Sequence, residues 1–473
     1  MPPMQNPAAF TGAVGTARAD ITPPVGIYCR NWGAAKHDVA RGIHRPLAVT
    51  AVAFRETAGG PPLVLLDADL GWWGSAAHER AFRGRILAAL GLPAERLLFA
   101  VTHTHSAPPL SPPEPHWPGG DLLLAFHATI EQAAVEAGRR AIAALEPAIL
   151  EWHAGSCRLA ANRDLPEPDR ATNAADGSRP RRIVCGYNPA GPADDTLLVG
   201  RVTAASGRPL ATIVNYACHP TTLAWENDLV SPDYVGAMRE TIEAATGGAP
   251  AVFLQGASGE LAPRHQYVGD PAVADGHGRE LGHAALAVLC AMEPPGERLG
   301  FAGVVESGAP LAVWRPEPRP AGGTQETTLA ARRATVDLPL KAWPTAAEIT
   351  AELAASTDRA LAERLRRRLR IREALGDGAT YPFEVWGWRI GGAAVLGTMA
   401  EAYSRIQQRV RAALADRPVV WLNLVNGAAG YLPPEPLYDL DIYPAWQTPF
   451  DRGSLERVEE TAIALGRELL GTA

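Results

Sequence analysis

Two histidines follow a short apolar run in the first quarter of the chain. Residues 97–102 read as a buried strand, and His103 and His105 come directly after it in the sequence THTHSAPP. Since side chains alternate along a strand, we expect both imidazoles to point to the same side. Two adjacent imidazoles are typical of a metal site or an acid–base pair. The alternative is a hydrogen-bonded pair of histidines that closes a turn.

A second apolar run ends in the same way. Residues 210–216 lead into His219 and Pro220 in the sequence NYACHPTTL. A single histidine at a strand exit is often only a hydrogen-bonded structural residue. Open α/β sheets, however, gather their binding sites at the carboxyl ends of strands. Two strands that both end in histidine therefore favour one shared site.

Two further candidates, Glu401 and Tyr431, follow the apolar runs 393–397 and 418–424. We place Glu401 in the first turn of a helix, where Thr398 and Glu401 also fit a helix capping box. Tyr431 lies in a glycine-rich loop, where a tyrosine commonly only packs at a rim. Each residue by itself therefore has a structural alternative.

A proline-rich loop and a serine complete the set of candidates. The loop 106–120 carries His116 and Trp117, and we expect it to form a stiff, partly apolar pocket wall. Ser258 lies in the sequence GASGE, which is not the G-x-S-x-G pattern of a nucleophilic serine. A serine nucleophile is therefore not supported.

The elements that must position these residues alternate along the chain. Buried strands are predicted at 48–54, 62–69, 97–102, 197–203, 210–216, 251–255, 393–397 and 418–424, and helices at 121–145, 234–246, 277–292, 346–375, 400–414 and 454–470. This alternation predicts an α/β fold with a mixed β-sheet core flanked by helices. We expect a single large catalytic domain over residues 1–473, with a possible internal linker at 315–325.

Charge and composition exclude several classes of protein. The net charge of −7 gives no basic surface for nucleic acid, and no apolar stretch is long enough to span a membrane. The basic run 364–372, RLRRRLRIR, is expected to be a solvated helix face balanced by acidic neighbours. The N-terminus shows no secretion signal, and the five cysteines lack a C-x-x-C spacing, so a cytoplasmic location is expected. No oligomeric state is predicted.

Taken in order, these segments resemble the catalytic domain of the neutral ceramidase family from about residue 14 to about residue 440. The similarity lies in VGTARADITPPVG, THTHSAPP, AANRD, NYACHPTTL and VSPDYVGAMRE. It implies a zinc ion, or another divalent metal, held by His103, His219, Glu401 and Tyr431. No counterpart of that family's C-terminal immunoglobulin-like domain is expected.

The resemblance also implies roles for residues around the metal. His105 would orient the attacked group or transfer a proton, and Arg163 or Asn162 would hold the oxyanion or a polar substrate group. Tyr431 would bind the metal or donate a hydrogen bond, and Glu260 would contribute to substrate binding. The implied function is zinc-dependent hydrolysis of an amide or related carbonyl bond in a small or lipid-like N-acyl substrate, using water activated by the metal.

The sequence departs from the family at one important position. Ala262 stands in the segment GELAP, where the family has G-D-x-S-P with a catalytically important serine. This change argues against ceramide as the substrate. It leaves open a metal-dependent enzyme that acts on a sugar, lactone or alcohol by hydrolysis or elimination. It also leaves open a protein that has lost catalytic activity and only binds a metal or ligand. His44, Asp69 and Asp233 lie in family-like segments and could support the site.

Overall fold

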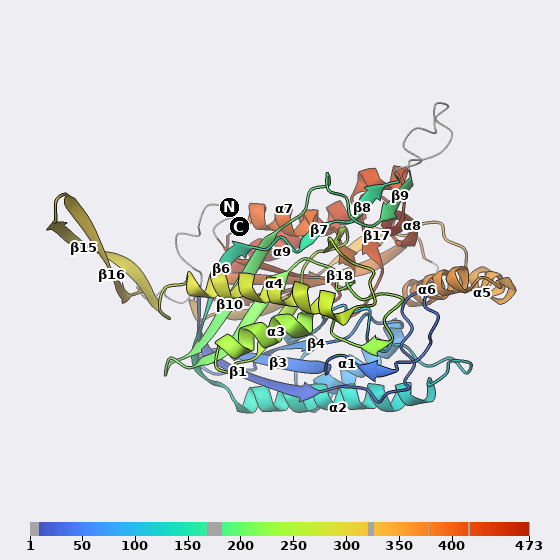
Figure 1. The fold of residues 1–473 in the computed structure, drawn as a ribbon, viewed down its shortest axis with the longest axis horizontal. Coiled ribbons are helices and arrows are strands. Elements are labelled where there is room, and N and C mark those ends of the chain that lie inside the picture. The colour runs from blue at the N-terminus through green and yellow to red at the C-terminus, as the bar shows by residue number, and fades with distance from the viewer. Residues whose placement is uncertain (1–8, 168–181, 320–325, 377, 415–416, 473) are drawn as a thin grey trace.

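The computed structural model describes residues 9–167, 182–319, 326–376, 378–414 and 417–472. In this part of the chain two β-sheets pack against each other, and helices cover the outer face of each (Figure 1). The fold is mixed α/β, as the alternating pattern predicts. The predicted linker at 315–325 begins inside a strand, and its residues 320–325 lie outside the described residues.

The larger sheet has eight strands. Their order is β13 (Ala251–Gln255), β11 (Pro209–Tyr216), β10 (Thr196–Ala204), β6 (Glu146–Ser156), β1 (Ala9–Asp20), β3 (Ala48–Arg55), β4 (Leu63–Ala68) and β5 (Leu97–Val101). The pairs β11–β13 and β4–β5 are parallel and the other neighbours are antiparallel, so the sheet is mixed.

The smaller sheet has four strands, in the order β17 (Leu329–Pro339), β18 (Thr380–Ile390), β19 (Ala393–Thr398) and β21 (Val419–Leu422). The pair β19–β21 is parallel. The eight predicted strands are all present, with small differences at their ends. Within these two sheets, four long strands, β1, β6, β17 and β18, were not predicted, because they mix exposed and buried residues and do not form continuous apolar runs.

Strand β5 shows why continuous apolar runs mark the buried strands. Leu97, Phe99 and Val101 pack toward helices, whereas Leu98 and Ala100 pack between the two sheets. Alternate residues of a strand face opposite sides, so a strand covered on both faces is apolar throughout. The turn that follows β5 therefore begins in the interior of the molecule.

Helices α1 (Ala76–Leu90), α2 (Asp121–Ala143), α3 (Tyr234–Ala245) and α4 (Pro271–Cys290) cover the larger sheet, and α7 (Arg405–Ala413) and α9 (Ser454–Leu470) cover the smaller one. The predicted helix at 346–375 is two helices, α5 (Ala346–Ala355) and α6 (Arg359–Leu375), because Asp358 caps the start of the second. Helix α8 (Tyr443–Gln447) is short. No helix among the described residues is long and apolar enough to cross a bilayer.

Short strand pairs join the loops at one end of the two sheets. They are β2 (Gly42–Ile43) with β12 (Leu229–Val230), β7 (Ala160–Asn162) with β14 (Leu261–Pro263), and β20 (Glu401–Ala402) with β22 (Tyr431–Leu432). Strand β9 (Arg182–Cys185) lies between β8 (Asp164–Pro166) and β23 (Asp441–Ile442). These pairs fix loops that come from distant parts of the sequence.

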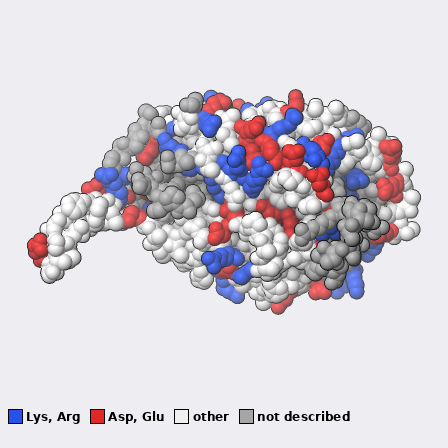
Figure 2. Space-filling model, turned by 90° about the horizontal axis from the view of Figure 1, so that it is seen from above, with Lys and Arg blue, Asp and Glu red and all other residues white. Residues whose placement is uncertain are grey.

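A hairpin of β15 (Glu297–Glu306) and β16 (Pro310–Pro318) projects from the body, at the left of Figure 1. Its exposed side chains include Phe301 and Trp314, which contact each other edge to face at 5.8 Å. Figure 2 shows this arm as mostly uncharged, whereas acidic and basic side chains are interspersed on the visible face of the body. That face presents no continuous basic surface.

Candidate metal centre and its cavity

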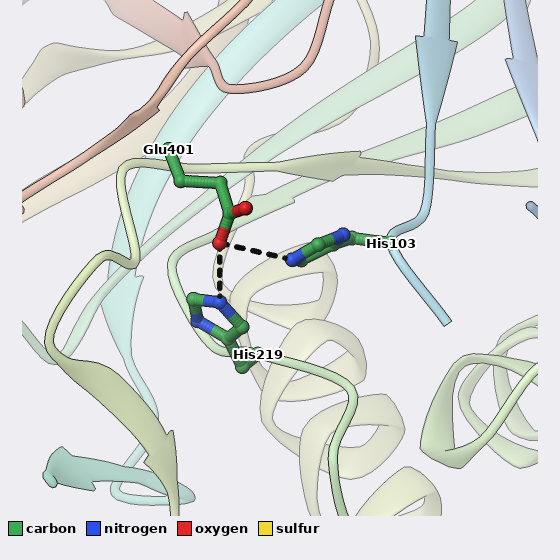
Figure 3. Close-up of side chains that lie close together, drawn as sticks. All are labelled: His103, His219 and Glu401. Atoms are coloured by element: carbon green, nitrogen blue, oxygen red, sulfur yellow. Dashed lines mark hydrogen bonds and ion pairs between the residues drawn. The ribbon is translucent and has the colours of Figure 1, made fainter. Parts of the chain in front are cut away.

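Two imidazoles and one carboxylate converge where strands of the two sheets end (Figure 3). Oε2 of Glu401 lies 3.3 Å from Nε2 of His103 and 3.0 Å from Nε2 of His219. Their possible ligand atoms all lie within 4.8 Å of one another. Within the described part of the chain, these three residues form the one histidine, cysteine and carboxylate cluster close enough to hold a metal ion.

The hydrogen bonds of the two rings determine where their protons sit. Nδ1 of His103 faces the backbone oxygen of Gly71 at 3.1 Å, and Nδ1 of His219 faces that of Ser258 at 2.7 Å. A carbonyl oxygen only accepts, so Nδ1 of each neutral ring carries the hydrogen and Nε2 keeps a lone pair. With both rings neutral, each Nε2 would point its lone pair at a carboxylate oxygen of Glu401. A cation between these three acceptors would stabilise the arrangement.

Burial keeps His219 in the neutral form that this arrangement requires. The ring is fully buried, and burial together with the nearby Arg163 lowers the pKa of His219 to about 3. Burial alone would raise the pKa of Glu401, but His103 and the contacts with both imidazoles hold it well below its usual range. The cluster thus combines a neutral imidazole and a carboxylate, a donor set that suits zinc.

The turn after β5 differs from the extended segment that the alternation argument assumed. The strand ends at Val101, and His103 has a φ of 70°, in the left-handed region that residues other than glycine rarely adopt. The rings of His103 and His105 nevertheless lie 4.9 Å apart and line one cavity. The convergence of the two imidazoles was predicted correctly, but the turn and not strand alternation produces it.

Glu401 does not lie in a helix, so that part of the prediction was wrong. Helix α7 begins only at Arg405, and Glu401 lies in β20, where its backbone N–H donates to Gly430 O at 2.9 Å. The capping box with Thr398 is not formed, because the Glu401 side chain turns to the two imidazoles. Pairing of β20 with β22 places Glu401 directly beside Tyr431.

The loops that carry the two histidines are tied together through one segment. Thr104 Oγ1 donates to the backbone oxygen of Ser231 at 2.7 Å, and Ser231 N donates to that of Ser106 at 2.9 Å. Two residues further along, Asp233 accepts from the backbone N–H of Leu223 in the loop after His219. The relative position of the imidazoles is thus set by buried hydrogen bonds in which the backbone of these loops takes part.

Tyr431 and Arg163 lie next to the cluster. The Tyr431 ring stacks 6.4 Å from the His219 ring, and its hydroxyl accepts a hydrogen bond from Arg163 Nη2 at 3.1 Å. Arg163 also donates twice to the backbone oxygen of Gly259. Although Arg163 is only 4% exposed, it forms no ion pair with any residue that the structure describes. Burial raises the pKa of Tyr431 well above its usual range, and the Glu401 carboxylate raises it further.

Asn162 and Glu260 hold Arg163 and do not line the cavity themselves. The backbone N–H of Arg163 donates to Glu260 O at 2.8 Å, and Asn162 pairs with Leu261 across β7 and β14. The Glu260 carboxylate accepts hydrogen bonds from the backbone and hydroxyl of Ser404. Both residues therefore contact the support of the site in this structure, although we expected them to contact substrate.

His105 is the imidazole that remains available for a ligand. Neither of its ring nitrogens hydrogen-bonds to a residue that the structure describes, and both are buried from solvent. Its ring lies 5.0 Å from that of Trp32 and 4.9 Å from that of Trp72. Burial, aided by the neighbouring His103, lowers the pKa of His105 well below its usual value, so the ring is neutral and can donate or accept one hydrogen bond.

The cluster opens into a cavity of about 350 Å³, a size typical of small-molecule sites. Aromatic side chains line much of it, namely Trp32, Trp72, Trp73, Tyr267, Tyr431 and Tyr443. Opposite the strand ends, α6 contributes Arg364, Arg367 and Arg370. We call His103, Glu401 and Tyr431, which line the cavity, together with the adjacent His219, which does not, the cluster wall. We call the three arginines the helix wall.

The helix wall corrects one expectation and adds residues that the sequence did not indicate. The basic run was expected to be a solvated face, but Arg367 packs over the Trp72 ring at 5.0 Å and donates to Asn31 O at 2.7 Å. Arg370 lies over Trp117. The spacing of three between the arginines was a visible signal, because it places them on one face of a helix.

The predicted wall residues His116 and Trp117 do not line this cavity. Trp117 stacks on Tyr28 with ring centroids 4.2 Å apart, and His116 is exposed beside Glu114. Their loop therefore packs behind the helix wall, where Glu114 also pairs with Arg370 at 3.1 Å.

The remaining candidates His44, Asp69 and Asp233 also lie outside the cavity lining. His44 contacts Ser231 at 2.9 Å, and Asp69 pairs with Arg239 at 2.5 Å. Asp233 caps α3. Each holds a loop or a helix in place around the site.

Two solved ceramidase structures have a fold similar to that of this chain. A ceramidase complexed with C2 aligns with a TM-score of 0.66 at 20% sequence identity, over 98% of this chain and 76% of that one. The neutral ceramidase from Pseudomonas aeruginosa aligns with the same TM-score and identity, over 98% of this chain and 75% of that one. The fold is that of neutral ceramidase. No family model matches the sequence, and no curated protein matches it.

The ceramidase-like fold agrees with the resemblance read from the sequence motifs. Three of the four residues that the resemblance implied as metal ligands, His103, His219 and Glu401, form the cluster described above. Ala262 is buried in β14, opposite Ala161 of β7, and does not line the cavity. At 20% identity the likeness shows the fold, and chemistry has to be argued from the residues of this chain.

Proposed function

We propose that this protein is a metal-dependent hydrolase that cleaves an amide or related carbonyl bond of a small or lipid-like N-acyl substrate. The observation that carries the proposal is the convergence of two imidazole nitrogens and a carboxylate oxygen beside a cavity that His103 and Glu401 line. The donor set fits zinc, with another divalent metal as the alternative, and Tyr431 lies where it can supply a fourth ligand. A divalent ion bound there would lower the pKa of water and polarise a carbonyl group.

The residues around the cluster can perform the other tasks of hydrolysis. His105 has both nitrogens free of described protein partners, so it can orient the substrate carbonyl or carry a proton to the leaving amine. Arg163 and Tyr431 are hydrogen-bonded to each other beside Glu401. They can stabilise the negative charge that develops on the attacked oxygen.

The nearby serine offers no alternative nucleophile. Ser258 Oγ accepts a hydrogen bond from Gln255 at 2.6 Å and does not line the cavity. Ala262 has no hydroxyl. Water is therefore the proposed nucleophile, and the reaction would proceed without a covalent serine intermediate.

Metal analysis of His219→Ala tests the proposed centre. We expect the wild-type protein to bind one divalent ion and the variant to bind far less, because losing even a partner of a metal ligand typically costs about 10–100-fold in affinity. His127→Ala is a matched control, since His127, on α2, is also buried but its Nε2 contacts Pro109 O, away from the cluster. Equal metal content in wild type and His219→Ala would contradict the assignment.

A substrate screen with the metal-loaded protein then tests the reaction. We expect hydrolysis of short or long N-acyl compounds and its loss in His219→Ala. Turnover of lactones or glycosides alone would instead favour the carbohydrate or lactone alternative. Turnover that survives in His219→Ala would place the chemistry elsewhere in the molecule.

A further inference from the structure

The cavity contains more positive than negative side chains. Its lining includes Arg163, Arg364, Arg367 and Arg370 but only two carboxylates, Glu363 and Glu401. Glu363 lies 3.4 Å from Arg367, and Glu401 belongs to the cluster. The carboxylate partner of Arg370 is Glu114, which does not line the cavity. An excess of positive charge in a cleft attracts anionic ligands.

Arg364 is the member of the helix wall that is free to bind a ligand. Its guanidinium lies 4.1 Å from the centre of the Trp446 ring, and it forms no hydrogen bond or ion pair with a residue that the structure describes. Arg367, by contrast, donates to Asn31 O, Tyr443 Oη and Glu363. A guanidinium that lies over an aromatic ring without a hydrogen-bonding partner can still bind an oxyanion through its N–H groups.

A row of aromatic rings leads from Arg364 to the cluster. Trp446 lies 4.8 Å from Tyr443, Tyr443 lies 5.4 Å from Tyr431, and Tyr431 lies 6.4 Å from His219. Tyr443 and Tyr431 both line the cavity. This side of the site therefore offers a cation at its outer end, an apolar surface in the middle and the metal cluster at its inner end.

We propose that the substrate carries an oxyanion, a carboxylate or a phosphate, that binds Arg364 while the carbonyl to be cleaved lies at Glu401. The apolar part of the substrate would lie along the row of rings. A neutral lipid such as ceramide would leave Arg364 without a hydrogen-bonding or ionic partner among the described residues and the substrate. The inference rests on the proposed function only in taking this cavity as the substrate site.

The test uses p-nitroanilides of dicarboxylic acids from succinic to suberic acid, each with a neutral twin that ends in a carboxamide. Hydrolysis adds water across the amide C–N bond and releases p-nitroaniline and the free acid. Chain length then measures the span from the cluster to the anion site. A third set that ends in phosphonate shows whether a phosphate is preferred.

Binding to the metal-free protein is measured by calorimetry, and KM is measured with the metal-loaded protein. At one chain length we expect an anionic probe to bind more tightly than its neutral twin. Arg364→Gln should weaken binding of that anionic probe by about tenfold and leave the twin almost unchanged, as expected for one charge-assisted hydrogen-bonded pair. Arg368→Gln is the matched control, because Arg368 also stacks on a tryptophan, Trp343, but does not line the cavity.

Three outcomes would overturn the inference: equal binding of anionic and neutral probes, equal losses for both in Arg364→Gln, and an equal loss in Arg368→Gln. Thermal unfolding of each variant checks that it folds; the exposed position of Arg364 favours an intact fold. The two proposals fail separately. Selective binding without turnover would refute hydrolysis alone, and turnover without selectivity would refute anion recognition alone.

Discussion

The two walls of the cavity are built in different ways. The cluster wall comes from turns at the ends of β5, β11, β19 and β21, and its residues are fixed by buried backbone hydrogen bonds. The helix wall is one face of α6, whose contacts with the rest of the molecule include arginines stacked on aromatic rings and ion pairs with Asp38 and Glu114. The cluster wall is therefore part of the core, whereas the helix wall is attached to it.

This difference separates chemistry from specificity. A metal cluster must hold its ligand atoms to within a fraction of an ångström, which rigid strand ends can do. Ligand selection can change with the residues on an added helix while the core stays intact. The strand ends thus hold the candidate metal cluster, whereas the residues on α6 are those proposed to select the ligand.

Removing the hydroxyl of Tyr431 should have the largest effect, confined to the cluster wall. Tyr431→Phe keeps the ring in its row but removes the acceptor of Arg163 Nη2 and the possible metal ligand. We expect kcat to fall by about a hundredfold or more with little change in KM, the size of effect seen when one group that stabilises developing charge is lost. Metal analysis of the variant shows whether the hydroxyl is also a ligand.

Tyr443→Phe is the matched control, because Tyr443 also lines the cavity and its ring lies next to that of Tyr431. The Tyr443 hydroxyl accepts only a long hydrogen bond, 3.4 Å, from Arg367 of the helix wall. We expect its loss to affect KM more than kcat. Equal losses of kcat in the two variants would contradict the division of the cavity into two walls.

The sequence predicted which residues form the cluster wall better than it predicted the local structure in which they lie. His103 and His219 could be found because each follows an apolar run, and the strands before them were predicted almost to the residue. Glu401 was identified but placed in a helix. Its strand exists because its N–H donates to Gly430 O, a contact between residues 29 positions apart that local periodicity does not reveal.

The helix wall was missed although its arginines are plain in the sequence. Arginines spaced three residues apart are also common on solvated helices, so the pattern cannot tell which face of α6 another element covers. Trp72 and Tyr443 determine that face, and they come from distant segments. Conversely, the prolines and aromatic residue of loop 106–120 predicted a pocket wall that packs elsewhere, on Tyr28.

The buried Glu260 behind the cluster wall makes stability depend on pH. Burial raises its pKa from 4.5 to about 7, against the hydrogen bonds from Ser404 that lower it. Folding therefore favours the protonated carboxyl. The stabilisation that the protonated Glu260 adds to the folded state is fully present below about pH 4.5 and is lost as the pH rises through 7. We expect Glu260→Gln to remove this loss. Between pH 5 and pH 9 the free energy of unfolding of the variant should therefore rise relative to that of the wild type by on the order of 2 kcal/mol.

Denaturant unfolding of both proteins across this pH range measures the difference. Glutamine keeps an oxygen that can accept from Ser404, so the packing around Arg163 should survive. Parallel pH profiles for wild type and variant would show that Glu260 is ionised in the folded protein over the whole range. Glu260 would then support the cluster wall as a charged carboxylate.

The smallest expected effect concerns the helix wall alone. Asp358 caps α6 by accepting from the backbone N–H groups of Ala360 and Leu361, so Asp358→Ala should destabilise the first turn by about 1 kcal/mol. KM for the anionic probes should rise, while kcat and metal content stay constant. Thr345→Ala removes the corresponding cap of α5, whose residues do not line the cavity, at a similar cost in stability. A loss of metal in Asp358→Ala would show that the two walls are coupled. A rise of KM in both variants would mean that general destabilisation weakens binding. The placement of α6 would then not be what selects the ligand.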